Sequence, residues 1–287
     1  MEAVAVKAHG KINLTLDVLE RRSDGYHEIR SVMQSIALAD QLEISKADKG
    51  IHLQVNLPFV EPADNLAYRA AELFFTAAEL DAGAVIRLEK NLPIAAGLGG
   101  GSADAAAVLW ALNQLYQTPF TLAELQVIGK QIGADVPFCL QGGTLLAEGI
   151  GDKLSLLPTI ADYYFVLVKP EQSVSTKKVY QALDPKLFGD HYTSRMVEKL
   201  KQGDSITSSF GNIMEQTTVR FVPEVAAWCE RMLQAGAVSS FMSGSGPTTV
   251  GVFNSKTEAE QFIQKWKHQC WMTVTKPYTT GISVVKE

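Results

Sequence analysis

The chain has 287 residues, a formal net charge of −5 at pH 7, 46% hydrophobic residues and 20% charged residues. This length and composition predict a globular protein with a sizeable core, in one large domain or two ordinary ones, and the acidic balance argues against a general nucleic-acid-binding or membrane-surface protein. Three widely spaced cysteines without a CxxC pair indicate neither a zinc site nor a disulfide framework, and because no apolar run could form a signal peptide or a membrane span, we expect a cytoplasmic protein.

The N-terminal part of the chain alternates strand and helix signals. Residues 12–19 alternate apolar and polar side chains, as a half-buried antiparallel strand does, and a turn signal follows at 21–25. Apolar residues recur at helical spacing over 66–80, which predicts a helix. The other strands or extended segments predicted in this part are 4–8, 26–36, 41–45, 51–55 and 85–89.

A glycine-rich segment followed by a helix is the most informative stretch of the sequence. Four of the five residues 97–101 are glycines, which reach positive φ at no steric cost and let another group approach the backbone. The Ala- and Leu-rich residues that follow favour a helix to Leu115, with Ser102 as its N-cap and Asp104 as a carboxylate in its first turn. Such a loop gathers unpaired N–H groups at a positive dipole end, so this segment suits a phosphate.

This loop does not fit two common phosphate-binding patterns. A P-loop needs Lys followed by Ser or Thr after its last glycine, but Ser102 and Ala103 follow here. The glycine spacing of residues 97–101 also differs from the dinucleotide fingerprint GxGxxG. From these residues alone, a flexible turn before a core helix stays an alternative to an anion-binding loop.

A capped helix follows the glycine-rich element. Thr121 and Glu124 form a capping box that opens a helix to about Ile132, and Gly133 ends this helix. Asp135 therefore falls in a loop or a short turn. A strand is predicted at 144–147.

A boundary at 157–158 divides the chain into predicted lobes of residues 1–157 and 158–287, and the class is α+β. The second lobe has predicted strands at 163–168, 238–242, 248–253, 271–275 and 282–285, and predicted helices at 175–183, 192–201, 208–216, 223–235 and 256–267. A second glycine-serine loop lies at 243–247, and taken alone it fits a strand-to-strand turn. Two such loops, with Lys11 and Asn13 beside a strand, favour a polyphosphate held from two sides.

These motifs carry a resemblance to known kinases. The run from Pro93 to Asp104 resembles the ATP-binding motif of the superfamily of galactokinase, homoserine kinase, mevalonate kinase and phosphomevalonate kinase. Within this superfamily the chain resembles the family of 4-diphosphocytidyl-2-C-methyl-D-erythritol kinases of the non-mevalonate isoprenoid route. The resemblance spans nearly the whole chain, is weakest over about 184–222, and is carried by residues 11–14, 24–27, 97–103 and 133–137.

The resemblance implies a fold, a reaction and small-molecule partners. The fold would have two lobes, the first with a ribosomal-protein-S5-like mixed sheet and helices and the second with an antiparallel sheet and helices. The reaction would be ATP-dependent phosphorylation of the 2-hydroxyl of 4-diphosphocytidyl-2-C-methyl-D-erythritol, with neither nucleic acid nor membrane as a partner. Mg²⁺ is the expected companion of ATP, but no carboxylate is clearly placed for it, so Ser102, phosphates and water are its expected ligands.

The resemblance also assigns residues to ATP. Asn65 and Lys90 fall where the family contacts adenosine. The residues expected at the phosphates are Pro93, Ile94, Ala95, Ala96, Gly97, Leu98, Gly99, Gly100, Gly101, Ser102 and Ala103.

Phosphoryl transfer needs neutralised charge on the transferred group and an orienter or base for the acceptor hydroxyl. Asp135 is the candidate base, and Lys11 is the candidate cation that keeps it ionised and polarises the acceptor oxygen. Without the resemblance, a turn aspartate and a solvated lysine would be the ordinary interpretations.

The resemblance places the cytidine end of the substrate at Tyr26 and His27, by stacking and by hydrogen bonding to the base. Tyr180 is the candidate for a second stacking aromatic, because 163–165 are more typical of the core. Asn13, Gly244 and Ser245 are further expected substrate contacts. Two alternatives stay open: another small-alcohol kinase of the superfamily, of the homoserine or mevalonate type, or a non-catalytic nucleotide-binding protein.

Overall fold

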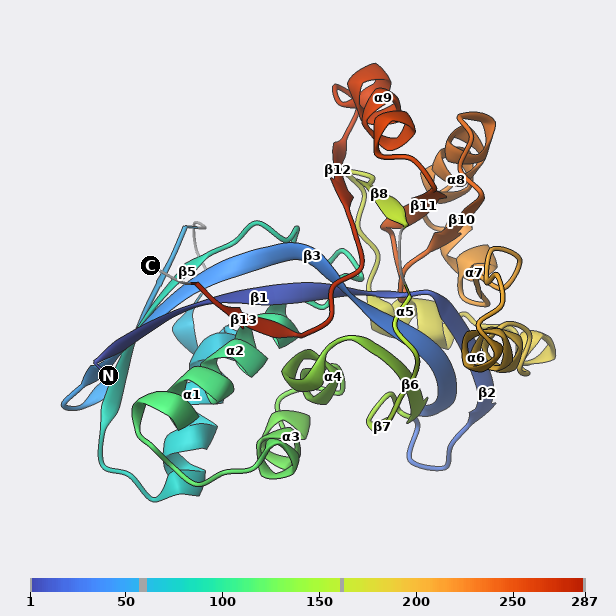
Figure 1. The fold of residues 1–287 in the computed structure, drawn as a ribbon. Coiled ribbons are helices and arrows are strands. Elements are labelled where there is room, and N and C mark those ends of the chain that lie inside the picture. The colour runs from blue at the N-terminus through green and yellow to red at the C-terminus, as the bar shows by residue number, and fades with distance from the viewer. Residues whose placement is uncertain (1, 57–60, 161–162, 286–287) are drawn as a thin grey trace.

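The computed structural model describes residues 2–56, 61–160 and 163–285, which form two sheets with helices around them (Figure 1). The first sheet has nine strands: β1 (Ala3–Asn13), β2 (Thr15–Arg21), β3 (His27–Ala47), β4 (Gly50–Val55), β5 (Gly83–Glu89), β6 (Thr144–Gly149), β7 (Lys153–Leu156), β9 (Gly211–Asn212) and β13 (Ile282–Val284). The second sheet has the order β10 (Ser239–Met242), β11 (Thr249–Phe253), β8 (Tyr164–Lys169), β12 (Trp271–Thr275), and all its pairs are antiparallel. The expected α+β class with a mixed and an antiparallel sheet is confirmed.

The helices fall into two groups that follow the two sheets. Those that lie along one face of the first sheet are α1 (Leu66–Ala78), α2 (Gly100–Leu115), α3 (Leu122–Lys130) and α4 (Val136–Gln141) (Figure 1). The later helices are α5 (Thr176–Gln181), α6 (Thr193–Gln202), α7 (Glu215–Val219), α8 (Glu224–Gln234) and α9 (Lys256–Trp266). Short 3-10 helices lie at Pro62–Asp64, before α1, and at Pro185–Leu187. Within the described ranges, we find no helix with the length and apolarity that crossing a membrane requires.

Helix α2 is the centre of the N-terminal core. Its alanines at 103, 105–107 and 111 are all buried, and they share one apolar cluster with strand β1, strand β3 and helix α1. Small side chains let the helix pack closely against the sheet, so the glycine loop before it leads into a rigid element. Strands β9 and β13 come from the second predicted lobe but pair with β2 and β1 of the first sheet. The boundary at 157–158 stays a prediction.

Three strand predictions need correction. Residues 12–13 of the predicted strand 12–19 belong to β1, and β2 begins only at Thr15. The extended segments 26–36 and 41–45 form one strand, β3, because the residues between them also pair with β1, as Ala39 does with His9. The first strand does not end at residue 8 but continues to Asn13, with a register shift at Gly10, where a Cβ would lie 2.7 Å from Leu92.

Predictions for two helices and one strand also fail. The predicted helix 208–216 is wrong: Gly211 and Asn212 pair with β2 as strand β9, and helix α7 begins only at Glu215. A Cβ at Gly211 would overlap the ring of Tyr192, so tertiary packing and not helix propensity decides the conformation of this segment. Helix α4 and strand β7 were not predicted; Asp135 lies in a short turn, as expected, and is the residue just before α4.

His9 ties the C-terminal strand region to the first sheet. It is 2% exposed, its Nδ1 donates to Ile36 O over 3.1 Å, its Nε2 lies 2.8 Å from Ser283 Oγ, and its ring stacks on Tyr278 at 3.8 Å. Burial lowers the pKa of His9 from 6.5 to about 4. The neutral ring is therefore the native form.

We expect this histidine to make the protein acid-sensitive. Between pH 6.5 and 4 the unfolded chain binds a proton at His9 that the folded chain does not, so the free energy of unfolding falls as pH falls. Urea unfolding at pH 7 and 4.5 should show wild type losing about 2 kcal/mol more than His9→Gln, which cannot titrate there. Equal losses in the two proteins would contradict this assignment.

Candidate active site

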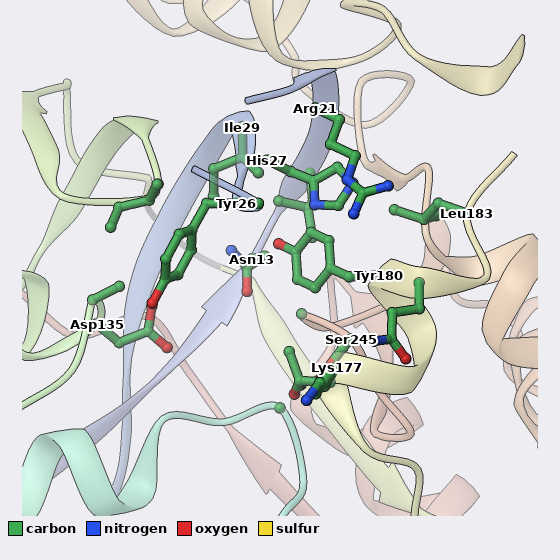
Figure 2. Close-up of a pocket in the computed structure, with 18 of the residues that line it drawn as sticks. Asn13, Arg21, Tyr26, His27, Ile29, Asp135, Lys177, Tyr180, Leu183 and Ser245 are labelled. Atoms are coloured by element: carbon green, nitrogen blue, oxygen red, sulfur yellow. Dashed lines mark hydrogen bonds between the residues drawn. The ribbon is translucent and has the colours of Figure 1, made fainter. Parts of the chain in front are cut away.

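A cleft of about 870 Å³ lies where β1, the β2–β3 turn, the glycine loop, α5 and the 243–247 loop meet. Figure 2 shows Tyr26 and Asp135 on one side of it, Tyr180, Lys177 and Ser245 on the other, and Asn13 between them. Its lining includes these residues that the sequence indicated: Lys11, Asn13, Tyr26, His27, Gly97, Gly99, Ser102, Asp135, Tyr180, Gly244 and Ser245.

The glycine loop presents the start of α2 to this cleft. Gly99 is the N-cap with φ +68°, and no side chain caps the helix. The first-turn N–H groups of a sixteen-residue helix are therefore left for an anion at its positive end. The prediction of Ser102 as N-cap is wrong, because the helix starts at Gly100; Asp104 lies beyond the first turn and is buried.

The two glycine loops pack directly on each other. Ser243 Oγ donates to Gly97 O over 3.0 Å and accepts from the backbone N–H of Asn13 over 3.2 Å. Gly97 has φ +75°, and a Cβ there would overlap the carbonyl oxygen of Ser243. The end of β1 and both loops are thus joined at one hydroxyl group.

Lys11 and Asp135 form an ion pair in the cleft, with 3.3 Å between Nζ and Oδ2. The Lys11 side chain is 6% exposed, and Asp135 is 36% exposed, so the carboxylate is the accessible member. Lys11 Nζ also donates to Asn13 Oδ1 over 2.8 Å, and Asn13 Nδ2 donates to Ser31 Oγ over 2.8 Å. Asp135 precedes α4, and its side chain makes no hydrogen bond to the first turn of that helix, so the carboxylate can face a ligand while it is paired with Lys11.

Aromatic side chains form the other end of the cleft. The rings of His27 and Tyr180 stack at 5.0 Å, and Phe188 packs edge-on against His27 at 5.8 Å. Burial, and then the nearby charge of Arg21, lower the pKa of His27, so its ring is neutral at neutral pH and can both donate and accept. Tyr26 is 61% exposed and faces the cleft from the β2–β3 turn.

Residues 163–165 pack in apolar clusters, as expected.

Several residues expected at ATP lie outside this cleft. Asn65 caps α1 by accepting from Ala67 N over 2.8 Å. Lys90 does not offer a free ammonium to adenosine, because Asp40 and Asp104 bind it in the interior. The others outside the lining are Pro93, Ile94, Ala95, Ala96, Leu98, Gly100, Gly101 and Ala103.

Sequence reasoning missed part of the lining. Arg21, Thr176, Lys177 and Phe188 all face the cleft. Thr176 Oγ1 lies 2.7 Å from Ser245 Oγ and so connects α5 to the second loop. A signal was present, since Thr176 and Lys177 precede Tyr180 by one helical turn.

The donor set here fits a magnesium ion that keeps most of its water. Among the residues that the structure describes, there is no group of three or more His, Cys, Asp or Glu side chains that could hold a metal ion. Ser102 and Asp135 are two of the oxygen donors that line the cleft. Magnesium bound chiefly by phosphates and water needs no more than this.

Comparisons with known proteins agree with this geometry. The model of the GHMP kinases N terminal domain matches residues 65–143, and that of the GHMP kinases C terminal matches 196–270. A 4-diphosphocytidyl-2-C-methyl-D-erythritol kinase from Acetivibrio thermocellus is 41% identical over 282 residues, covering 96% of this chain and all of the relative. The chain belongs to this kinase family. The predicted superfamily and enzyme class are thereby confirmed.

Further members extend the comparison. The 4-diphosphocytidyl-2-C-methyl-D-erythritol kinase of Pelotomaculum thermopropionicum is 46% identical over 92% of this chain and 94% of its own length. A crystal structure of 4-(cytidine 5'-diphospho)-2C-methyl-D-erythritol kinase superposes with TM-score 0.82 at 35% identity, covering 94% of this chain and 98% of that one. The homoserine kinase of Cytophaga hutchinsonii, with TM-score 0.78 and 21% identity over 99% and 98% of the chains, shows the shared fold alone. This kinase family therefore has the two-lobed GHMP fold.

Proposed function

We propose that this chain transfers the γ-phosphoryl group of ATP to the 2-hydroxyl of 4-diphosphocytidyl-2-C-methyl-D-erythritol. The observation that carries the proposal is the Lys11–Asp135 pair, which shares one cleft with the uncapped N-terminus of α2. The names of the relatives supply the acceptor, and the aromatic end of the cleft supports a cytosine base there.

The chemistry follows from these positions. The acceptor oxygen forms a bond to the γ-phosphorus while the bond from that phosphorus to the β–γ bridging oxygen breaks, and ADP leaves. Asp135 takes the proton of the acceptor hydroxyl, and Lys11, which is paired with this carboxylate, polarises the acceptor oxygen. The N–H groups at Gly99 and beyond bind phosphate oxygens, and Ser102 would supply a hydroxyl ligand to a magnesium ion, which would neutralise phosphate charge.

Removing the aromatic contacts should weaken the acceptor specifically. We expect Tyr26→Ala and His27→Ala each to raise KM for the cytidyl substrate about tenfold, the scale of losing base stacking, while KM for ATP changes little. Steady-state kinetics with each substrate varied in turn measures this. His268→Ala, at an exposed position outside the cleft, is the matched control. Equal rises in both KM values would show that these residues do not recognise the base.

The decisive assay combines the protein with ATP, Mg²⁺ and the cytidyl substrate. ADP release and a new phosphomonoester signal by phosphorus NMR are the expected results. Homoserine and mevalonate, tested in parallel, should give no product. Turnover of either one without turnover of the cytidyl compound would establish a different acceptor, and ATP binding without any transfer would favour a non-catalytic protein.

A further inference from the structure

A buried triad of charged side chains lies against the start of helix α2. Lys90 Nζ donates to Asp104 Oδ2 over 2.6 Å and forms a second ion pair with Asp40 Oδ2. Lys90 is 9% exposed, Asp104 is 4% exposed and Asp40 is fully buried. Buried charges are costly unless each is paired, so the loss of one member leaves a charge uncompensated.

The triad connects the segments that shape the phosphate loop. Asp40 is part of β3, and its Oδ1 accepts the backbone N–H groups of Asn91 and Leu92 over 2.6 and 2.7 Å, just before the loop begins. Asp104 belongs to α2. A Cβ at Gly100, the first residue of α2, would lie 3.2 Å from Lys90 Nζ. The ammonium group therefore abuts the backbone of the turn that reaches the cleft.

The triad has more carboxyl groups than ammonium groups. Two carboxylates share one ammonium group, and Asp104 Oδ1 has no hydrogen-bond partner within the described part of the chain. Burial raises the pKa of Asp104 well above its usual value, although Lys90 lowers it. Burial alone would lower the pKa of Lys90, but Asp104 and Asp40 raise it, so Lys90 is held in its charged form.

We propose that Lys90 is a positioning residue for the triphosphate and not a contact to adenosine. Its ammonium group holds Asp40 and Asp104 together behind the first turn of α2 and offsets negative charge that would otherwise repel phosphates. The inference rests on the proposed kinase function, because that function places the triphosphate at this turn. It follows that the contribution of Lys90 to nucleotide affinity grows with the number of phosphates.

Calorimetry of adenosine, ADP and ATP binding to wild type and Lys90→Gln tests this dependence. The substitution should weaken ATP binding at least about tenfold, or ~1.4 kcal/mol, weaken ADP binding less and leave adenosine binding within about twofold. Lys49→Gln, at a 77% exposed surface position, is the matched control. Equal losses for adenosine and ATP would overturn the proposal and make Lys90 an adenosine contact.

A second substitution separates charge compensation from a merely structural role. Asp104→Asn in the Lys90→Gln background keeps an acceptor but removes one of the two carboxyl groups left without a cation, so it should restore ATP affinity at least ~3-fold. Additive damage would overturn the proposal. If circular dichroism shows that Lys90→Gln does not fold, Asp104→Asn alone should bind ATP at least as tightly as wild type, and a tenfold loss would contradict this.

The same measurements distinguish failure of the inference from failure of the proposed function. Wild type that binds ATP but phosphorylates no acceptor contradicts the proposed function, while the adenosine-to-ATP series still decides the role of Lys90. Wild type that binds ATP no more tightly than adenosine contradicts both.

Discussion

Replacing Asp135 with Asn is expected to lower kcat at least ~10²-fold, the scale of losing a general base, while KM for ATP stays within about twofold. The amide keeps the size of the side chain and can still face Lys11, but it cannot take a proton from the acceptor hydroxyl. Because the carboxylate does not cap α4, its replacement should leave the helix intact. Single-turnover measurements of product formation separate this chemical step from product release.

The control for this variant is another aspartate in a different setting. Asp81 is 85% exposed and pairs with Lys49 at the surface, so Asp81→Asn removes the same charge from the chain without touching the cleft. Its kcat should match wild type, since exposed ion pairs contribute about 0–1 kcal/mol. Near-normal turnover in Asp135→Asn would show that this residue is not the base of the reaction.

The local parts of this site could be predicted from the sequence. The glycines before an Ala-rich segment predicted a loop at a helix start, where the structure has Gly99 before α2, and the capping box at Thr121 is present as predicted. The resemblance placed Lys11 and Asp135 in one site, and the structure brings them within 3.3 Å. These signals are local or lie in short motifs, for which the backbone has few possible conformations.

Three features of the structure were not predicted from the sequence. Ser102 has the chemistry of an N-cap, yet a left-handed Gly99 starts the helix earlier. Lys90 is an ordinary lysine in the sequence, and only the fold of β3 against α2 supplies its two carboxylate partners. Gly211 pairs with β2 from far along the chain, which no local helix signal could indicate.

A further prediction concerns the contact between the two glycine loops. Gly97→Ala should lower kcat/KM for ATP about 10²-fold, because an atom placed on the Ser243 carbonyl oxygen forces the loops apart and displaces the phosphate-binding N–H groups. The chain offers a close control in Gly203, which also has φ +75° but meets nothing within 4 Å of a Cβ. Gly203→Ala should cost about 1–2 kcal/mol of unfolding free energy from left-handed strain and leave the kinetics unchanged. Gly97→Ala carries the same strain and adds the overlap, so the difference between the two variants isolates the contact of the loops. Similar kinetics in both variants would mean that the site tolerates separation of the loops, and that the joint at Ser243 does not set the position of the phosphates.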